Sequence, residues 1–409
     1  MQRFGRWRRN LPTLVLACAL AGSAGLSPLP GLQAQTPPVP CADLPNAVLV
    51  PGTTDVKPFL ARVAGQLAGA AAAQQLTIVY QAMGSCTALE PVLGNATVTG
   101  DAVYWTPNGE ERTCTLGAGA LPDLALSDVT IETCTGAPAP ARISQSASMV
   151  QPFGFVVPPA SSQTAITAAE AYVLFRYGTA AGKQVAPWTD PALVAIRTPA
   201  SSTQLLIGLA AGVRGTQFSP NLTNVSAGSS AVVAKVAAEN ATGNAERTIG
   251  ILSAQRYDEN RDKLRMLAFE AYRQQCLGAV YPDATATSFD KRNVRDGHYA
   301  IWGYLWAVAR TDPEGLAPPR AQKFLSFLNG TLDVPGLDLV AETAKAGAIP
   351  ACAMTVQRTT DGGPLLPYTP AEPCACRFEL ATTGSTPCVP CPDGTCATGL
   401  CRGGYCETL

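Results

Sequence analysis

Apolar positions near the start of the chain alternate between short runs and a helical pattern. Residues 47–50 are apolar, and the segment 56–73 repeats apolar side chains at helical spacing, for example at Phe59 and Val63. A further apolar run, at 76–80, is rich in β-branched and aromatic residues. The pattern predicts a strand, a loop, a helix and a second strand in that order.

The same order returns in the middle of the chain. A capping box formed by Thr167 and Glu170 marks the start of one of its helices. Strands and helices in repetition predict an α/β fold with mainly parallel strand pairing. The expected elements are strands at 152–157 and 193–196 and helices at 165–177 and 203–213.

Composition removes several classes of function. Only 14% of the 409 residues are charged, and 29 basic side chains face 30 acidic ones, so the net charge of −1 offers no field for nucleic acids. His298 is the only histidine, which excludes a histidine-rich zinc site and leaves one ring for any Ser-His-Asp or Cys-His catalyst. No P-loop, G-x-G-x-x-G or G-x-S-x-G motif occurs. We therefore expect a protein that is not an enzyme and has no cofactor or metal.

The N-terminus has the order of a secretory signal. Four arginines lie within residues 1–9, an apolar run covers 11–26, and small and polar residues follow, so we expect a signal peptide at 1–34. A competing interpretation makes Cys18 a lipid-attachment site, although Leu16 stands where a small residue is usual. No later run is long enough to span a membrane. The mature chain is expected to be periplasmic or secreted, with anchoring at Cys18 as the alternative.

The cysteines divide into a sparse set and a dense tail. Of the 14 cysteines, one lies in the signal, six are spread between Cys41 and Cys352, and seven crowd 374–406, behind a Pro/Gly-rich linker. An exported chain favours disulfides, so we expect the tail to be a small disulfide-held unit. Zinc is the weighed alternative, but only Cys388 and Cys391 have CxxC spacing. With the signal removed 14 − 1 = 13 cysteines remain, so one is free, intermolecular or wrongly counted.

Hydroxyl residues gather between predicted strands and helices. Thr53, Thr54 and Asp55 follow the first strand, and Arg197 precedes the run 201–203 at the start of a later helix. A helix start offers free backbone N–H groups and the positive end of the dipole, which together suit an anion. Helix capping explains each cluster equally well by itself. The added guanidinium of Arg197 favours a cage for a tetrahedral oxyanion.

These residues resemble the periplasmic phosphate-binding proteins of ABC importers, which have the type 2 periplasmic-binding-protein fold. The resemblance covers about 310 residues, from 48 to 356, and leaves the cysteine tail uncovered. Later segments at 226–233, 248–252 and 279–282 also match in order. The ligand contacts that the resemblance implies are Thr53, Thr54, Ser85, Asp128, Arg197, Ser201, Ser202 and Thr203.

Three positions depart from the family pattern. The family carries an acidic residue two positions after the arginine, where this chain has Pro199. Ser202 stands where glycine is common, and Cys86 replaces a small residue of a glycine-rich continuation. Pro199 raises the question of what orients the guanidinium of Arg197.

The resemblance implies an architecture and a mode of action. It implies two α/β lobes joined by a hinge, with lobe one at 41–145 and 256–365, lobe two at 146–255, and a cysteine-rich tail at 374–406. Phosphate or a related oxyanion would bind between the lobes of a monomer, which would deliver it to an ABC permease. Asp128 can only accept hydrogen bonds when ionised, so it would favour hydrogenphosphate over sulfate. A turn or capping role is the alternative for Asp128.

Two polar segments support weaker hypotheses. The stretch 281–303 contains Asp296 and His298, which could form an acid-base pair in a secreted hydrolase, but we interpret it as a surface loop with a turn at Asp296. The mixed charges of 256–265 are typical of a solvated helix face. The alternative to ligand capture is a secreted or surface-displayed protein that keeps the fold without a transport ligand.

Overall fold

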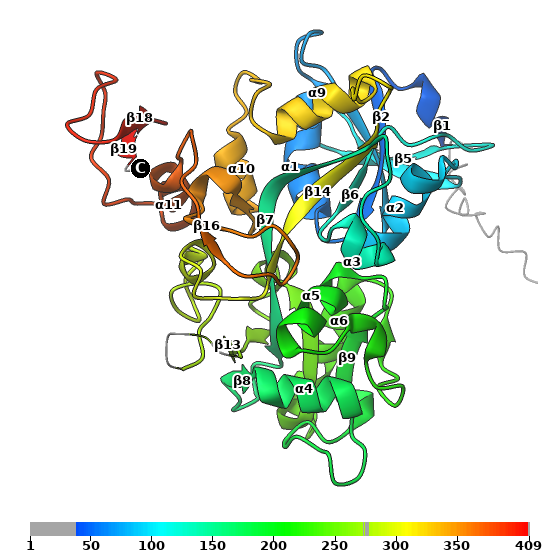
Figure 1. Ribbon diagram of the computed structural model, residues 1–409, viewed down its shortest axis with the longest axis vertical. Coiled ribbons are helices and arrows are strands. Elements are labelled where there is room, and N and C mark those ends of the chain that lie inside the picture. Colours follow the sequence, from blue (N-terminus) through cyan, green and yellow to red (C-terminus); the bar gives the residue numbers. More distant parts are fainter. Residues whose placement is uncertain (1–37, 273, 275–277, 408–409) are drawn as a thin grey trace, which may run out of the picture. The chain divides into compact units, whose positions relative to one another are not determined.

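The computed structural model describes residues 38–272, 274 and 278–407 (Figure 1). The expected signal peptide at 1–34, including Cys18, lies outside this range, and so does Cys276. Among the described residues no helix is long and apolar enough to cross a membrane. Strands and helices alternate through the fold, which confirms the α/β prediction. The expected mainly parallel pairing is wrong, because nine pairs of the described strands are antiparallel and six are parallel.

The first set of strands surrounds β2 (Ala47–Thr53). It pairs in parallel with β3 (Thr77–Met83) over its whole length, and α1 (Lys57–Ala68) connects the two. The helix expected at 56–73 ends sooner because Gly69 interrupts it and the alanines that follow have little side chain to bury. The set is completed by β6 (Ala125–Ser127), β4 (Asp101–Trp105), β5 (Glu111–Thr115) and β1 (Val39–Pro40), with helices α2 (Ser85–Gly94) and α3 (Ile131–Thr135).

A long strand belongs to two sets of strands. β7 (Ile143–Val157) pairs with β14 (Trp302–Arg310) beside the first set and with β11 (Ile249–Ser253) in the second (Figure 1). The sheet order is β1-β5-β4-β3-β2-β6-β14-β7-β11-β9-β10, in which β9 covers Val194–Arg197 and β10 covers Val225–Ser226. β12 (Arg265–Met266) and β15 (Ile349–Pro350) also pair with β7. One backbone ladder therefore joins the two lobes.

The second set carries the four helices α4 to α7. α4 (Ala168–Tyr177) begins with the predicted capping box of Thr167 and Glu170, whereas residues 165–167 form the short strand β8 (Ala165–Thr167). Phe155 of β7 stacks on Phe175 of α4 in the core of this lobe. The remaining elements are β9 (Val194–Arg197), β10 (Val225–Ser226), α5 (Ser202–Ala211), α6 (Ser229–Ala238) and α7 (Ala254–Asp258).

The segment after α7 packs with the second lobe. β12 (Arg265–Met266) pairs with the end of β7, and β13 (Ala268–Glu270) pairs with β8. Tyr257 and Leu264 are buried with Val156 in the same cluster. The predicted lobe boundary at 255/256 does not coincide with this packing, because the apolar run at 264–269 finds its partners on β7 and β8. Strands of the first lobe resume only at β14.

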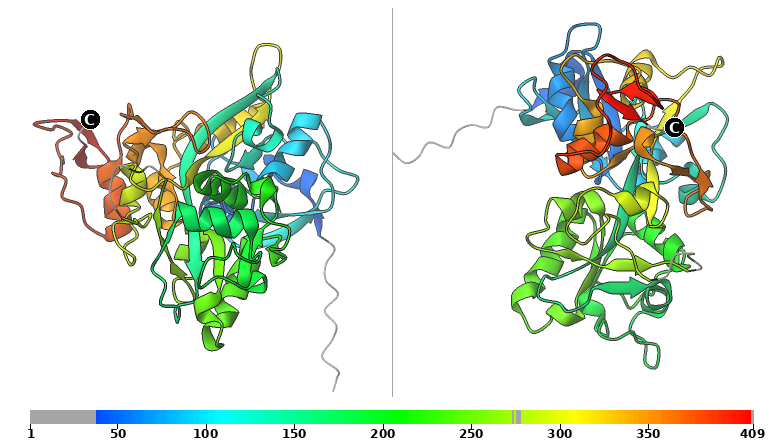
Figure 2. Two further views of the ribbon diagram at one scale, coloured as in Figure 1. Left: turned by 60° about the horizontal axis from the view of Figure 1, so that its bottom comes forward. Right: turned by 90° about the vertical axis from the view of Figure 1, so that its left-hand side faces the viewer.

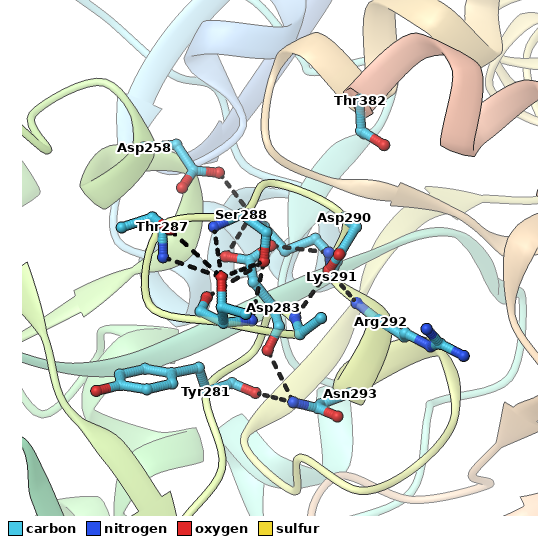
Figure 3. A network of polar contacts seen from close by, with 12 residues as sticks. Asp258, Tyr281, Asp283, Thr287, Ser288, Asp290, Lys291, Arg292, Asn293 and Thr382 are labelled. Atoms are coloured by element: carbon cyan, nitrogen blue, oxygen red, sulfur yellow. Dashed lines mark hydrogen bonds and ion pairs between the residues drawn. The ribbon is translucent and has the colours of Figure 1, made fainter. Parts of the chain in front are cut away.

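Two charges of this segment, Asp258 and Arg261, are largely buried. Lys291 is 1% exposed, and its Nζ lies 2.8 Å from Asp258 and 3.0 Å from Asp283. Figure 3 shows these three side chains together. Arg261 contacts the same two carboxylates, at 2.6 and 3.0 Å. The expectation of a solvated helix face at 256–265 is therefore wrong for Asp258 and Arg261, whereas Glu259, Asp262 and Lys263 are exposed. Asp258 and Arg261 form ion pairs with Lys291 and Asp283 of the loop 283–291. These partners lie too far along the chain for a helical pattern within 256–265 to predict the pairing.

Asp296 and His298 are exposed, which agrees with the surface-loop interpretation around the turn. The interpretation is wrong for other parts of 281–303, where Asp283, Lys291 and Arg295 are buried. A turn follows Asp296, where Gly297 has a positive φ of 80° that a side chain would strain. The short helix α8 (Arg292–Arg295) precedes this turn.

Six disulfides join the described cysteines. Cys352–Cys374 ties the tail to the fold, and Phe378 of α11 (Ala375–Thr383) lies in the core of the second lobe. The β18–β19 hairpin (Leu400–Arg402 and Tyr405–Glu407) lies beside α11 (Figure 2). Cys391, Cys396 and Cys406 place their sulfurs within 4.8 Å of one another, but all three are oxidised and offer no thiolate to zinc. The other pairs are Cys41–Cys114, Cys86–Cys134 and Cys376–Cys388.

The chain between β14 and the tail is attached to the first lobe by hydrogen bonds. Asp361, in the linker expected at 361–373, accepts hydrogen bonds from the backbone and hydroxyl of Thr130 and from Thr133. This contact fixes the linker to the first lobe. The elements of the region are α9 (Pro319–Leu328), α10 (Leu339–Lys345), β15 (Ile349–Pro350), β16 (Val356–Gln357) and β17 (Leu366–Pro367).

Lys291→Met should lower the free energy of unfolding by about 3–5 kcal/mol, because it leaves two buried carboxylates with Arg261 as their nearest cation. Urea unfolding followed by circular dichroism measures the change. Lys263→Met, on an exposed side chain of the same segment, is the matched control and should stay near wild type. Equal stability of Lys291→Met and wild type would show that the ion network does not hold the loop.

Candidate functional site

The predicted contact residues lie where strands end and helices begin. Thr53 ends β2, Ser85 opens α2 after β3, and Asp128 follows β6. Arg197 ends β9, and Ser202 opens α5. Because carboxyl ends of neighbouring parallel strands meet at one edge, the two lobes bring these side chains to a common place. All of the predicted contacts are buried except Thr54, which is partly exposed.

Asp128 connects hydroxyls from both lobes. Its Oδ2 accepts hydrogen bonds from Thr53 Oγ1 at 2.6 Å and from Ser202 Oγ at 2.8 Å. Its Oδ1 is buried and has no hydrogen-bond partner among the described residues, and the same is true of Ser85 Oγ. Buried polar atoms without a partner are costly, so each is expected to face a group that supplies one. An acceptor and a hydroxyl of this kind suit a ligand with both O–H groups and bare oxygens.

Arg197 is oriented without an acidic residue at position 199. Its Nη1 donates to Ser229 Oγ at 2.6 Å, and its Nη2 reaches Ala227 O at 3.2 Å and Thr54 Oγ1 at 3.4 Å. A further bond runs from Nε to Ser226 O at 3.3 Å. The backbone carbonyls before α6 therefore orient the Arg197 guanidinium, a role that the family pattern gives to an acidic residue at the position of Pro199.

Three helices begin at this place without a side-chain cap in the described structure. Gly84, Ser201 and Gly228 are the N-cap residues of α2, α5 and α6, and none of them makes a side-chain capping hydrogen bond. The capping explanation for Ser201 is thus not met by this geometry. Three sets of helix-start N–H groups with their positive dipole ends converge on the cluster, an arrangement that stabilises anions.

A second carboxylate, Asp55, was missed as a site residue in the sequence. It is fully buried and accepts hydrogen bonds from Ser229 at 2.7 Å, Ser253 at 3.0 Å and Thr203 at 3.2 Å. Ser229 opens α6 and Ser253 ends β11, so both follow the strand-to-helix rule that identified the other hydroxyls. The position between a strand and a helix could have identified Ser229 and Ser253 from the sequence. Nothing in the sequence shows that Asp55 accepts all three hydrogen bonds.

Glycine at position 52 allows the first loop to pack closely. A Cβ there would lie 2.8 Å from Cε2 of Tyr80, and the Tyr80 hydroxyl donates a short hydrogen bond to the backbone oxygen of Thr53. Burial raises the pKa of Tyr80 well above its usual value, so the ring stays a neutral donor. This contact holds Thr53 in place beside Asp128.

The charges of the cluster influence one another. Burial, with a further contribution from Asp55, raises the pKa of Asp128 to about 7, against the opposing hydrogen bonds of Thr53 and Ser202 and the charge of Arg197. Burial also lowers the pKa of Arg197, while Asp55 and Asp128 oppose that change. Arg256 adds a second guanidinium through a bond from Nη2 to Thr54 O at 3.4 Å.

The sequence matches no protein-family model and no curated protein. Its structure is similar to a phosphate ABC transporter substrate-binding protein with bound phosphate from Clostridium perfringens, at 16% identity and a TM-score of 0.50 over 75% of this chain and 100% of that one. An ABC-type phosphate transport receptor from Vibrio cholerae matches at 14% identity and a TM-score of 0.47, over 74% and 99%. A reduced OxyR from N. meningitidis matches at 11% and 0.42, over 75% and 100%. The first likeness shows that the fold is the two-lobed type 2 periplasmic-binding-protein fold.

Asp128 should make stability depend on pH. Its pKa of about 7 exceeds that of an unfolded aspartate, so between about pH 4 and about pH 7 the folded protein holds a proton that the unfolded chain has released. The free energy of unfolding should therefore fall as pH rises through this window. Asp128→Asn should lack this part of the slope in urea unfolding at about pH 5 and about pH 7.5. Asp101→Asn, on an exposed carboxylate, is the control and should keep it.

Proposed function

We propose that the chain is an extracytoplasmic solute-binding protein that captures phosphate or a related oxyanion between its two lobes. The observation that carries the proposal is the set of three uncapped helix starts, of which α6 begins beside Arg197 and α5 beside Asp128, together with the unpartnered atoms Ser85 Oγ and Asp128 Oδ1. A tetrahedral oxyanion can use such donors without a basic protein surface.

Each of the predicted contacts has a part in this proposal. Thr54, Ser85 and Ser201 supply hydroxyl donors, and Arg197 supplies charge-assisted ones. The hydroxyl of Thr203 donates to Asp55, so Thr203 contributes its place in the first turn of α5. Thr53 and Ser202 hold Asp128, whose free oxygen accepts a hydrogen bond from the O–H of a hydrogenphosphate. Bonds from both lobes would then close around the ligand by a hinge motion. The protein binds and delivers, and it catalyses no reaction.

The setting proposed for this activity is outside the cytoplasm. Six disulfides, including the four that involve the tail, favour an oxidising compartment such as the periplasm or the exterior. An ABC permease is the proposed recipient of the ligand, and the chain would act as a monomer. A lipid at Cys18 would keep it at the membrane.

The alternative is a secreted or surface-displayed protein that keeps the fold for adhesion or interaction. Two observations favour it: hydroxyl donors of the cluster already bond to Asp55, and the tail has an added disulfide-held surface. Calorimetric titration with inorganic phosphate separates the two functions. Stoichiometric heat supports capture, and its absence supports the alternative.

Arg197→Gln should weaken phosphate binding by about tenfold to a hundredfold, the expected loss for a charge-assisted hydrogen bond of about 1.5–3 kcal/mol. Isothermal calorimetry measures the affinity. Arg214→Gln removes an exposed guanidinium of the same lobe and should bind like wild type. Equal loss in both variants would point to a nonspecific charge effect, and no loss in either would remove Arg197 from the site.

Asp128→Asn should reduce the preference for phosphate over sulfate. Asparagine can donate a hydrogen bond, so it no longer rejects an oxyanion that has no proton of its own. Competition of the two anions in calorimetry at about pH 8, where Asp128 is mainly ionised, measures the preference. Unchanged selectivity would show that Asp128 serves only to hold Thr53 and Ser202.

A further inference from the structure

Asp55 places a second carboxylate among the proposed ligand donors. Its three hydrogen bonds come from α5, α6 and the end of β11, all in the second lobe, whereas Asp55 follows β2 in the first. One of these donors, Thr203, is itself a proposed ligand contact. Another, Ser229, accepts a hydrogen bond from Arg197 and donates one to Asp55. Asp55 is therefore within the cage and not merely near it.

Asp55 retains capacity to accept another hydrogen bond. A carboxylate has two oxygens with about four acceptor positions, and three hydroxyl donors occupy Asp55. Oδ2 has only the longest of the three bonds, from Thr203. A ligand O–H that approaches Thr203 would meet this oxygen, just as one that approaches Ser202 would meet the free oxygen of Asp128.

The charged groups around Asp55 are balanced before an anion arrives. Asp128 faces it from the end of β6, Arg197 from β9, Arg256 from α7, and the neutral Tyr80 from β3. Arg256, whose side chain is partly exposed, also forms an ion pair with Glu259 at 2.8 Å, so these groups offer no excess of positive charge. A dianion would enter with no net positive charge to receive it, and at low dielectric such an imbalance is expensive.

We propose that Asp55 is a second ligand-facing carboxylate that restricts the site to singly charged oxyanions carrying two hydroxyl hydrogens, such as dihydrogenphosphate. The inference rests on the proposed function, because it assigns the charge of the ligand taken at the same site. Two O–H groups of such a ligand donate to Asp55 and Asp128, and its two bare oxygens accept from the arginine, hydroxyl and helix-start donors. A hydrogenphosphate dianion has one proton and would leave one carboxylate facing a bare oxygen.

The affinity for total phosphate should then follow the monoanion. Asp128 has a pKa of about 7, so the ionised form that accepts a ligand O–H is maintained above that pH. Phosphate loses its second proton near neutral pH, so the dihydrogen form decreases about tenfold between about pH 8 and about pH 9. Calorimetry with inorganic phosphate should show about a tenfold weaker wild-type affinity at the higher pH. Asp55→Asn keeps the shape and a hydrogen-bonding oxygen but removes the charge, so its affinity should change about threefold or less and exceed that of wild type at about pH 9.

The controls separate charge from folding and from the proposed function. Asp101→Asn removes an exposed carboxylate of the first lobe and should keep the wild-type pH profile, and thermal unfolding confirms that each variant is folded. A purely structural Asp55 would alter affinity equally at both pH values. That result, or identical profiles for Asp55→Asn and wild type, overturns the inference and leaves phosphate capture intact.

Two outcomes involve the proposed function itself. If neither wild type nor Asp55→Asn binds phosphate at either pH, both the inference and the proposed function fail. If wild type is silent at both pH values and Asp55→Asn binds, Asp55 excludes the monoanion as well, which overturns both the inference and the capture of phosphate by the natural chain.

Discussion

The structure between the two lobes depends on satisfying buried carboxylates with hydroxyl groups. Asp55 and Asp128 both lie in the first lobe and are both fully buried, and most of their hydrogen-bond donors lie in the second. A buried charge without such donors is costly, so the hydroxyls of α5, α6 and β11 must be presented at this place. This requirement explains why serine and threonine dominate the strand ends in a chain so poor in charge.

The same requirement limits which hydrogen bonds a ligand can form at this site. Hydroxyls that already donate to Asp55 are only partly available, whereas Ser85 Oγ and Asp128 Oδ1 have no partner among the described residues. The site is therefore a hydrogen-bond network in which two buried atoms still lack a partner, and not a positively charged pocket. Its selectivity follows from which protons the ligand can give, as much as from the charge it carries.

Sequence patterns predicted the features that are local. The helix α1, the capping box of α4 and the hydroxyl-bearing ends of β2 and β9 all follow from spacing within a few residues. The salt bridge of Lys291 to Asp258 could not be foreseen, because its partners are brought together by β12 and β13, which the sequence did not reveal. The sequence placed Asp55 in the first loop but did not predict its role as a hydrogen-bond acceptor, because its donors Ser229 and Ser253 contact it only in the tertiary structure. Disulfide pairing was likewise open, and Cys352–Cys374 joins the two groups into which the cysteines had been divided.

β7 is one strand with two sets of neighbours, and this has a mechanical consequence. Rotation of one lobe against the other would bend β7 itself. Its ladder to β14 changes register between Tyr304 and Trp306, where two residues of β7, Ser148 and Met149, lie opposite Leu305. Bending at this bulge breaks fewer backbone hydrogen bonds than bending at a regular stretch. The extra residue in β7 thus gives the strand a place to bend while its regular pairs stay intact.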